Sequence, residues 1–177
     1  MMIHNFRHCM SISSQTVFIV DDDMSVCRSL GRLMRLAGLE ARTFSSAEDF
    51  LETQTKPLSE PSCLVLDLQM PGLSGLDLQS RMSASEISCP VIFISGNGSI
   101  PTSVQAMRQG ALTFLPKPFD NEELLRAIAE ALDRHRDQLA SVSQVSAVQE
   151  RVKQLSEREL EVMSWIITGA LNKQIGA

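Results

Sequence analysis

The chain has no long uninterrupted run of apolar residues, although 44% of its 177 residues are hydrophobic. A helix that crosses a membrane requires about 20 consecutive apolar residues, so no membrane span and no membrane partner are predicted. Residues 1–15 contain His4, Arg7 and His8 but no continuous apolar segment, which argues against a secretory signal peptide. We expect a disordered leader there; His4, His8 and Cys9 as metal ligands are the less favoured alternative.

Paired cysteines and an excess of basic residues are also absent. The four cysteines, Cys9, Cys27, Cys63 and Cys89, have no paired spacing in a chain that is neither short nor cysteine-rich, so no disulfide framework is predicted. Free thiols favour a reducing compartment, and we expect a cytoplasmic protein. The net charge of −5 gives the chain as a whole no electrostatic footprint for nucleic acid. There is no internal repeat.

Two apolar runs end on carboxylates. Residues 17–20 read Val-Phe-Ile-Val and lead into Asp21-Asp22-Asp23, and residues 63–66 lead into Asp67. If both runs are buried strands of one parallel sheet, their carboxylates meet at its carboxyl edge, where open α/β folds bind ligands. Carboxylates this close repel one another unless the pKa rises or a basic partner or cation is present. Hard oxygen ligands so arranged suit Mg²⁺.

Strand and helix patterns alternate over about 120 residues after the leader. Five predicted strands alternate with five predicted helices, which indicates an α/β fold with a doubly wound parallel sheet. The predicted strands are residues 17–20, 39–44, 63–66, 90–94 and 112–115. The predicted helix caps are Asp23, Ser45 or Ser46, Ser99, and Asp120 or Asn121.

Right-handed crossovers would place all five carboxyl ends on one edge. The side chains of Asp21, Asp22, Asp67, Ser95 and Lys117 should therefore converge there, although they span almost a hundred positions.

Residues 16–133 resemble the receiver domain of two-component response regulators. Each feature is a weak signal alone, but all occur in the family's order and spacing. They are the pair Asp21-Asp22 after the first strand, Asp67 before Met-Pro-Gly-x-x-Gly, Ser95 after the fourth strand, and Lys117-Pro118 after the fifth. The resemblance implies a CheY-like fold with strand order 2-1-3-4-5.

The resemblance also implies a role for each acidic residue. Asp67 would accept a phosphoryl group. Asp22 and Asp67, with the backbone carbonyl of Gln69, would ligate Mg²⁺ directly, and Asp21 would act through water. The chemistry agrees, because a carboxylate nucleophile is repelled by phosphate oxygens unless a shared cation neutralises them. Asp23 is expected to be a capping or solvated acid.

Three further residues would form the family's switch. Lys117 would supply positive charge and Ser95 a hydroxyl donor to the phosphoryl oxygens. A cis bond between Lys117 and Pro118 would aim the ammonium inward, as in the family. Phe114 matches the family's aromatic that turns inward on phosphorylation; an ordinary half-buried core Phe is the alternative interpretation.

Residues 134–154 form the expected connection to a second domain. Apolar or semi-polar residues recur there at spacings of three or four, which predicts either an amphipathic helix that could pair with a second copy or a loose tether. The recurring positions are Leu132, His135, Leu139, Val142, Val145, Val148, Val152 and Leu155.

Residues 155–177 resemble the beginning of a LuxR-type helix-turn-helix domain of the FixJ/NarL class. Leu-Ser-x-Arg-Glu, Glu-Val and Gly-x-x-Asn-Lys-x-Ile carry the resemblance, and Ser156 and Glu159 form a capping box. Such a domain reads DNA with its second helix, which this sequence does not complete. We expect a truncated domain without specific DNA binding, with Lys173 a phosphate contact only in an intact parent.

The sequence thus predicts a FixJ-type response regulator. A sensor histidine kinase would phosphorylate Asp67, the phosphorylated receiver would form a homodimer, and the output domain of the intact parent would regulate transcription. No enzymatic activity is expected beyond the chain's own phosphorylation and dephosphorylation.

Two alternatives are weighed against this prediction. A stand-alone phosphorelay or docking receiver would need no DNA-binding domain. A haloacid-dehalogenase-like phosphatase would use Asp21-x-Asp23, which leaves Asp67 and Lys117-Pro118 unexplained.

Overall fold

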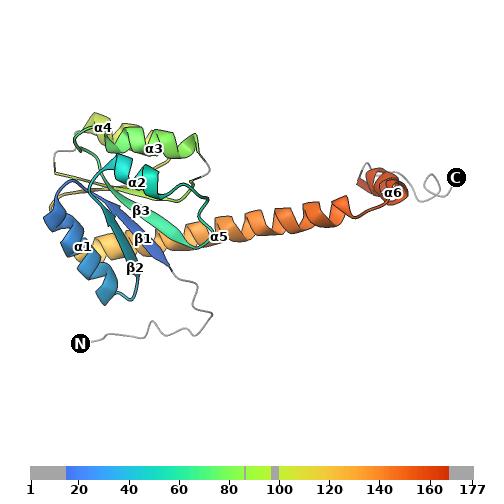
Figure 1. The fold of residues 1–177 in the computed structure, drawn as a ribbon, viewed down its shortest axis with the longest axis horizontal. Helices are drawn as coiled ribbons and strands as arrows, with labels where there is room; N and C mark the ends of the chain where they lie inside the picture. The colour runs from blue at the N-terminus through green and yellow to red at the C-terminus, as the bar shows by residue number, and fades with distance from the viewer. Residues whose placement is uncertain (1–14, 86, 97–99, 168–177) are drawn as a thin grey trace. The chain divides into compact units, whose positions relative to one another are not determined.

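The computed structural model describes residues 15–85, 87–96 and 100–167 (Figure 1). The chain divides into two compact units, Met1–Leu139 and Ala140–Ala177. Three of the sequence predictions, namely the leader apart from Gln15, the cap Ser99 and the phosphate contact Lys173, lie outside the described residues. No helix in the described ranges is long and apolar enough to cross a membrane.

The first unit is built on a five-stranded parallel sheet with the order β2-β1-β3-β4-β5, which confirms the predicted fold class and order. The order reverses between β1 and β3, and this reversal leaves a crevice at their carboxyl ends. Val20 pairs with Leu66, so Asp21 and Asp67 leave neighbouring strands side by side. The strands are β1 (Thr16–Val20), β2 (Glu40–Phe44), β3 (Ser62–Asp67), β4 (Val91–Ser95) and β5 (Thr113–Pro116).

Capping side chains start the helices where the sequence predicts them. Asp23 accepts the Ser25 N–H at 2.7 Å, Ser46 accepts the Asp49 N–H at 3.1 Å, and Asp120 accepts the Glu122 N–H at 2.8 Å. Ser156 and Glu159 form the predicted capping box. The helices are α1 (Met24–Leu36), α2 (Ala47–Thr53), α3 (Gly75–Ser83), α4 (Ile100–Arg108), α5 (Asn121–Lys153) and α6 (Glu157–Ile167).

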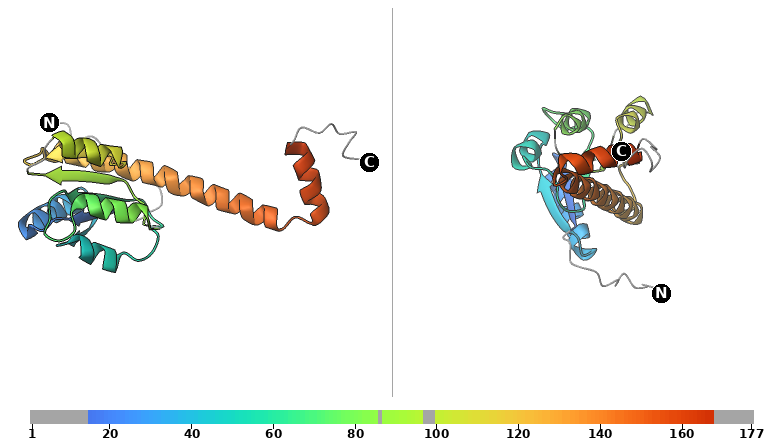
Figure 2. Two further views of the ribbon diagram at one scale, coloured as in Figure 1. Left: turned by 90° about the horizontal axis from the view of Figure 1, so that it is seen from above. Right: turned by 90° about the vertical axis from the view of Figure 1, so that its right-hand side faces the viewer.

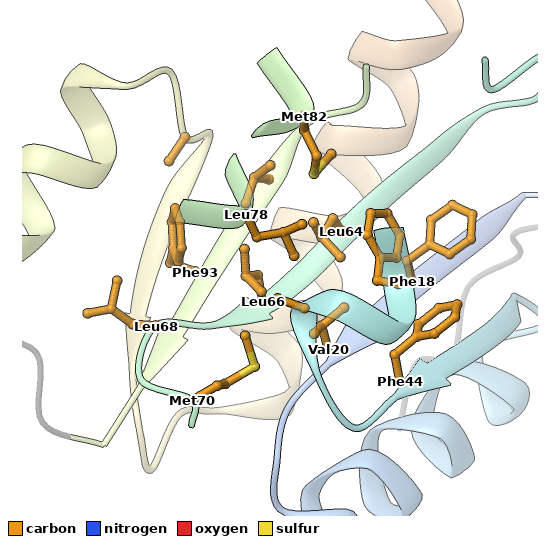
Figure 3. Packing of buried hydrophobic residues seen from close by; sticks show 14 of the residues in the cluster. Phe18, Val20, Phe44, Leu64, Leu66, Leu68, Met70, Leu78, Met82 and Phe93 are labelled. Carbon is orange, nitrogen blue, oxygen red and sulfur yellow. The ribbon is translucent and has the colours of Figure 1, made fainter. Parts of the chain in front are cut away.

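Alternating side chains divide the core of the first unit into two layers. Val17 and Ile19 point to the face that α1 and α5 cover, whereas Phe18 and Val20 point to the face covered by α2, α3 and α4 (Figures 1 and 2). Figure 3 shows the second layer, where Phe18 and Phe44 pack beside the side chains of β3 and α3. Strands covered on both faces explain the continuous apolar runs of the sequence.

α5 continues as one helix from Asn121 to Lys153. Residues 134–153 are therefore helical, which agrees with the first of the two interpretations of this segment. Val142, Val145 and Val148 are exposed on it, by 59%, 57% and 56%. Their pairing with a second copy stays a prediction.

His135 is buried on α5 and joins this helix to the amino end of β3. Its Nδ1 accepts a hydrogen bond from the Ser62 N–H at 2.9 Å, across 73 positions of sequence. Burial, the largest influence, lowers the pKa of His135 below its ordinary value of 6.5. Protonation of Nδ1 would remove this acceptor, so the fold requires a neutral imidazole.

We predict that acid weakens the wild-type fold more than that of His135→Gln. Because the pKa of His135 is lower in the folded chain than in the unfolded chain, its neutral form stabilises the fold fully at pH values above the unfolded pKa. This stability is lost as the pH falls from the unfolded pKa through the folded pKa. A glutamine oxygen can still accept the Ser62 N–H without titrating. Urea unfolding from about pH 8 to about pH 5 should show that the free energy of unfolding of the wild type falls relative to that of His135→Gln as the pH is lowered. Parallel stability curves would contradict the assignment.

Candidate functional site

The ammonium of Lys117 joins two buried carboxylates at the carboxyl edge of the sheet. Its Nζ lies 2.6 Å from Asp21 Oδ2 and 2.9 Å from Asp67 Oδ1. Asp21 is 1% exposed and Asp67 5% exposed. β1, β3 and β5 each deliver one of these side chains, so three of the five side chains that were predicted to converge are in contact.

A backbone hydrogen bond fixes the position of Lys117 at the end of β5. Its N–H donates to the Ser95 carbonyl at 2.7 Å, which ties the end of β5 to the end of β4. The Lys117-Pro118 peptide bond is cis, as the resemblance to receiver domains implies.

Burial and charge act in opposite directions on the site's ionisable groups. Burial, the largest influence, raises the pKa of Asp67; the hydrogen bond and charge of Lys117 oppose the rise, and the charge of Asp21 adds to it. Burial would lower the pKa of Lys117, but its bonds to Asp21 and Asp67 outweigh burial and raise that pKa. Lys117 is therefore a permanent cation at neutral pH.

Oxygen atoms suited to Mg²⁺ belong to Asp21 and Asp67 and to residues near them in the chain. The Gln69 N–H donates to Asp67 Oδ2 at 3.1 Å, so the peptide that follows the strand lies against the carboxylate, and Asp22 stands exposed beside Asp21. In the described ranges no three His, Cys, Asp or Glu side chains form a metal cluster. Mg²⁺ needs only one or two carboxylates, completed by other oxygens and water. The donor set therefore fits this ion.

Ser95 and Phe114 lie on β4 and β5, the last two strands of the sheet order. Ser95 is 1% exposed at the end of β4. Phe114 is half-buried, is in register with Phe93 of β4, and packs against the layer that holds α2, α3 and α4. This position is compatible with both interpretations of Phe114.

Asp23 contacts the site through its backbone, because its N–H donates to Asp21 Oδ1 at 2.9 Å. Its exposed carboxylate caps α1, and the hydrogen bonds to Ser25, the largest influence, lower its pKa. This is the capping role that the sequence predicts for Asp23.

One contact near the site was missed by sequence reasoning. Glu48, in the first turn of α2, accepts the Leu73 N–H at 3.1 Å in the loop after Asp67. A single acidic residue at a helix start resembles any solvated acid. The sequence signal that could have indicated this contact is Gly72, because a glycine lets the loop turn close to the Glu48 carboxylate.

Close packing behind Asp67 requires the glycine that opens α3. A Cβ on Gly75 would overlap the carbonyl oxygen of Asp67 and would lie 3.0 Å from the Phe93 ring. The first turn of α3 can therefore lie directly against the end of β3.

We predict that Gly75→Ala lowers the free energy of unfolding by about 1–3 kcal/mol, because the added methyl group overpacks this junction. The control is Gly31→Ala in α1, where the nearest atom, Thr43 Cγ2, is 3.6 Å away. That change should stabilise by up to about 1 kcal/mol through helix propensity. Denaturant unfolding measures both, and equal effects would refute the packing argument.

A second prediction concerns the raised pKa of Asp67. As the pH rises from about 4 to about 7, the wild type should lose stability relative to Asp67→Asn, because ionising Asp67 is harder in the folded chain than in the unfolded one. The variant resembles the protonated acid and cannot ionise. Unfolding without divalent cations measures the difference, and a wild type that gains stability relative to Asp67→Asn as the pH rises would show the opposite shift.

Comparison with known proteins agrees with this geometry. A family model described as the response regulator receiver domain matches residues 17–129. Nodulation protein W of Bradyrhizobium diazoefficiens is 42% identical over 170 residues, which cover 96% of this chain and 74% of that protein. Response regulator protein TodT of Pseudomonas putida F1 is 42% identical over 168 residues, covering 95% and 73%.

Solved structures show the same likeness. The response regulator StyR superimposes with a TM-score of 0.82 at 42% identity, over 92% of this chain and 81% of that one. FixJ-N superimposes with a TM-score of 0.63 at 35% identity, over 69% and 96%. The chain therefore belongs to the family of two-component response regulators that carry a receiver domain.

Proposed function

We propose that Asp67 accepts a phosphoryl group from a sensor histidine kinase in a Mg²⁺-dependent reaction, and that this switches a transcription-regulating output. The observation that carries the proposal is the Lys117 ammonium held 2.9 Å from Asp67 Oδ1 at the crevice of a receiver fold. Receiver domains are the partners of sensor histidine kinases, which supports the choice of donor.

Each residue of the site has a task in this reaction. A carboxylate oxygen of Asp67 attacks phosphorus, and the bond to the donor's leaving group breaks. Lys117 supplies positive charge to the phosphoryl oxygens, and the Ser95 hydroxyl donates to one of them. Asp22, Asp67 and the Gln69 carbonyl would hold Mg²⁺ directly, and Asp21 would hold it through water. The bound ion would supply positive charge next to the phosphoryl oxygens.

The output half of the proposal is supported by the C-terminal unit and by the relatives. FixJ of Azorhizobium caulinodans and TdiR of Thauera aromatica are named transcriptional regulatory proteins, and they are 37% and 36% identical to this chain. The capped helix α6 begins at the point where the LuxR-like sequence begins. We propose that residues 155–177 belong to a DNA-binding output domain.

We also propose that phosphorylated receivers pair with each other. Val104 and Met107 are 44% and 46% exposed on α4, a helix that contacts β5. Inward rotation of Phe114 would alter this surface, so the phosphorylated state would expose a different apolar patch.

The test of the central step is intact mass with acetyl phosphate as donor. We predict that the wild type gains one phosphoryl group with Mg²⁺ and none with a chelator. Asp67→Asn should gain none, whereas Asp49→Asn, which alters an exposed acid of α2, should behave as the wild type. The adduct should be acid-stable and base-labile, as expected of an acyl phosphate. A gain that survives in Asp67→Asn would place the phosphoryl group elsewhere.

A further inference from the structure

The loop of residues 68–74 joins Asp67 to α3 and is held at two places. Its first half is anchored by burial: Leu68 is 3% and Met70 9% exposed, and both belong to the apolar layer shown in Figure 3. The Leu68 N–H also donates to the Ile94 carbonyl at 3.0 Å. Apolar contacts place a segment, but they are non-directional and do not orient its peptide groups.

The second half of the loop is held by Glu48. Its Oε1 accepts the Leu73 N–H at 3.1 Å, from a side chain 25 positions earlier in the sequence. Gly72 has a φ of +79°, and a Cβ there would lie 2.7 Å from the same oxygen. The loop therefore turns tightly around the carboxylate, and a side chain at position 72 would push it away.

Glu48 is itself well placed by the fold. Ser46 caps α2 directly before it, and the rings of Phe44 and Phe50 pack edge-on at 5.4 Å on either side of this start. The first turn of α2 is thus fixed to the end of β2, at the same edge of the sheet as Asp21 and Asp67. Glu48 joins this fixed turn to the loop that follows Asp67.

We propose that Glu48 is a positioning residue for the phosphorylation site. By holding Leu73, its carboxylate orients the loop so that the Gln69 carbonyl faces the site and the Gln69 N–H stays on Asp67 Oδ2. This rests on the proposed function, because the orientation matters only if Mg²⁺ is bound there. Glu48 acts through the loop backbone and not as a ligand.

Two variants separate the hydrogen bond from the charge. Glu48→Ala removes both, whereas Glu48→Gln keeps an oxygen that can accept the Leu73 N–H and removes only the charge. Glu52→Ala is the matched control, since Glu52 is an exposed acid one turn further along α2. Thermal unfolding checks that each variant is folded.

The first readout is hydrogen exchange of the Leu73 amide without metal. This amide should be protected in the wild type, Glu48→Gln and Glu52→Ala, and it should exchange faster in Glu48→Ala. Equal protection in Glu48→Ala, or no protection in the wild type, would overturn the proposed tie.

The second readout is Mg²⁺ affinity by calorimetry, without a phosphodonor. Residues that orient metal ligands typically change affinity by about tenfold or more, so we expect Glu48→Ala to bind Mg²⁺ about tenfold more weakly. Glu48→Gln and Glu52→Ala should remain close to the wild type. An equal loss in Glu48→Gln would show that charge acts instead of positioning, which would overturn the proposal.

Gly72→Ala approaches the same contact from the loop side and serves if Glu48→Ala is poorly folded. It should raise Leu73 exchange and weaken Mg²⁺ binding, and part of its effect should vanish when combined with Glu48→Ala, because the clash is with Glu48. Fully additive effects would overturn the proposal.

Measurements on the wild type separate a failure of the proposed phosphorylation of Asp67 from a failure of the positioning role of Glu48. A wild type that neither binds Mg²⁺ nor gains a phosphoryl group overturns the proposed function and this inference together. A wild type that does both, with Glu48→Ala unchanged, overturns the inference alone.

Discussion

The sharing of one ammonium between Asp21 and Asp67 is the interaction on which the site depends. Two carboxylates almost closed off from water would repel each other across neighbouring strands, and removing either from water costs free energy. Lys117 offsets both effects with two short charge-assisted hydrogen bonds. Because the lysine lies 96 and 50 positions from its partners, the site exists only when β1, β3 and β5 are all in place.

A lysine suits this position for a physical reason. Its ammonium is a compact charge on a flexible stem, so it can move from a carboxylate to a phosphoryl oxygen without a change of backbone. The tie between the Lys117 N–H and the Ser95 carbonyl keeps the base of that stem fixed. In the proposed reaction, the same side chain therefore stabilises the site before phosphorylation and the product after it.

The sequence predicted the strands and helices, whose patterns recur along the chain, and the residues that directly follow successive strands. Apolar runs showed the fully buried strands β1, β3 and β4, and the crossover rule placed Asp21, Asp67 and Lys117 together. Contacts between distant single residues were not predictable. His135 fitted the apolar stripe assigned to the connecting helix, yet it is buried against Ser62, because one histidine at a helical spacing carries no sign of its partner.

Glu48 shows the same limit at the site itself. Burial of Leu68 and Met70 follows from hydrophobicity and could be expected, whereas the direction of each loop peptide depends on a few polar partners chosen in three dimensions. The apolar layers thus bring the loops to the carboxyl edge, and single hydrogen bonds determine how the loops face it. A change of function within such a fold therefore requires few substitutions, because the polar contacts can change while the core stays intact.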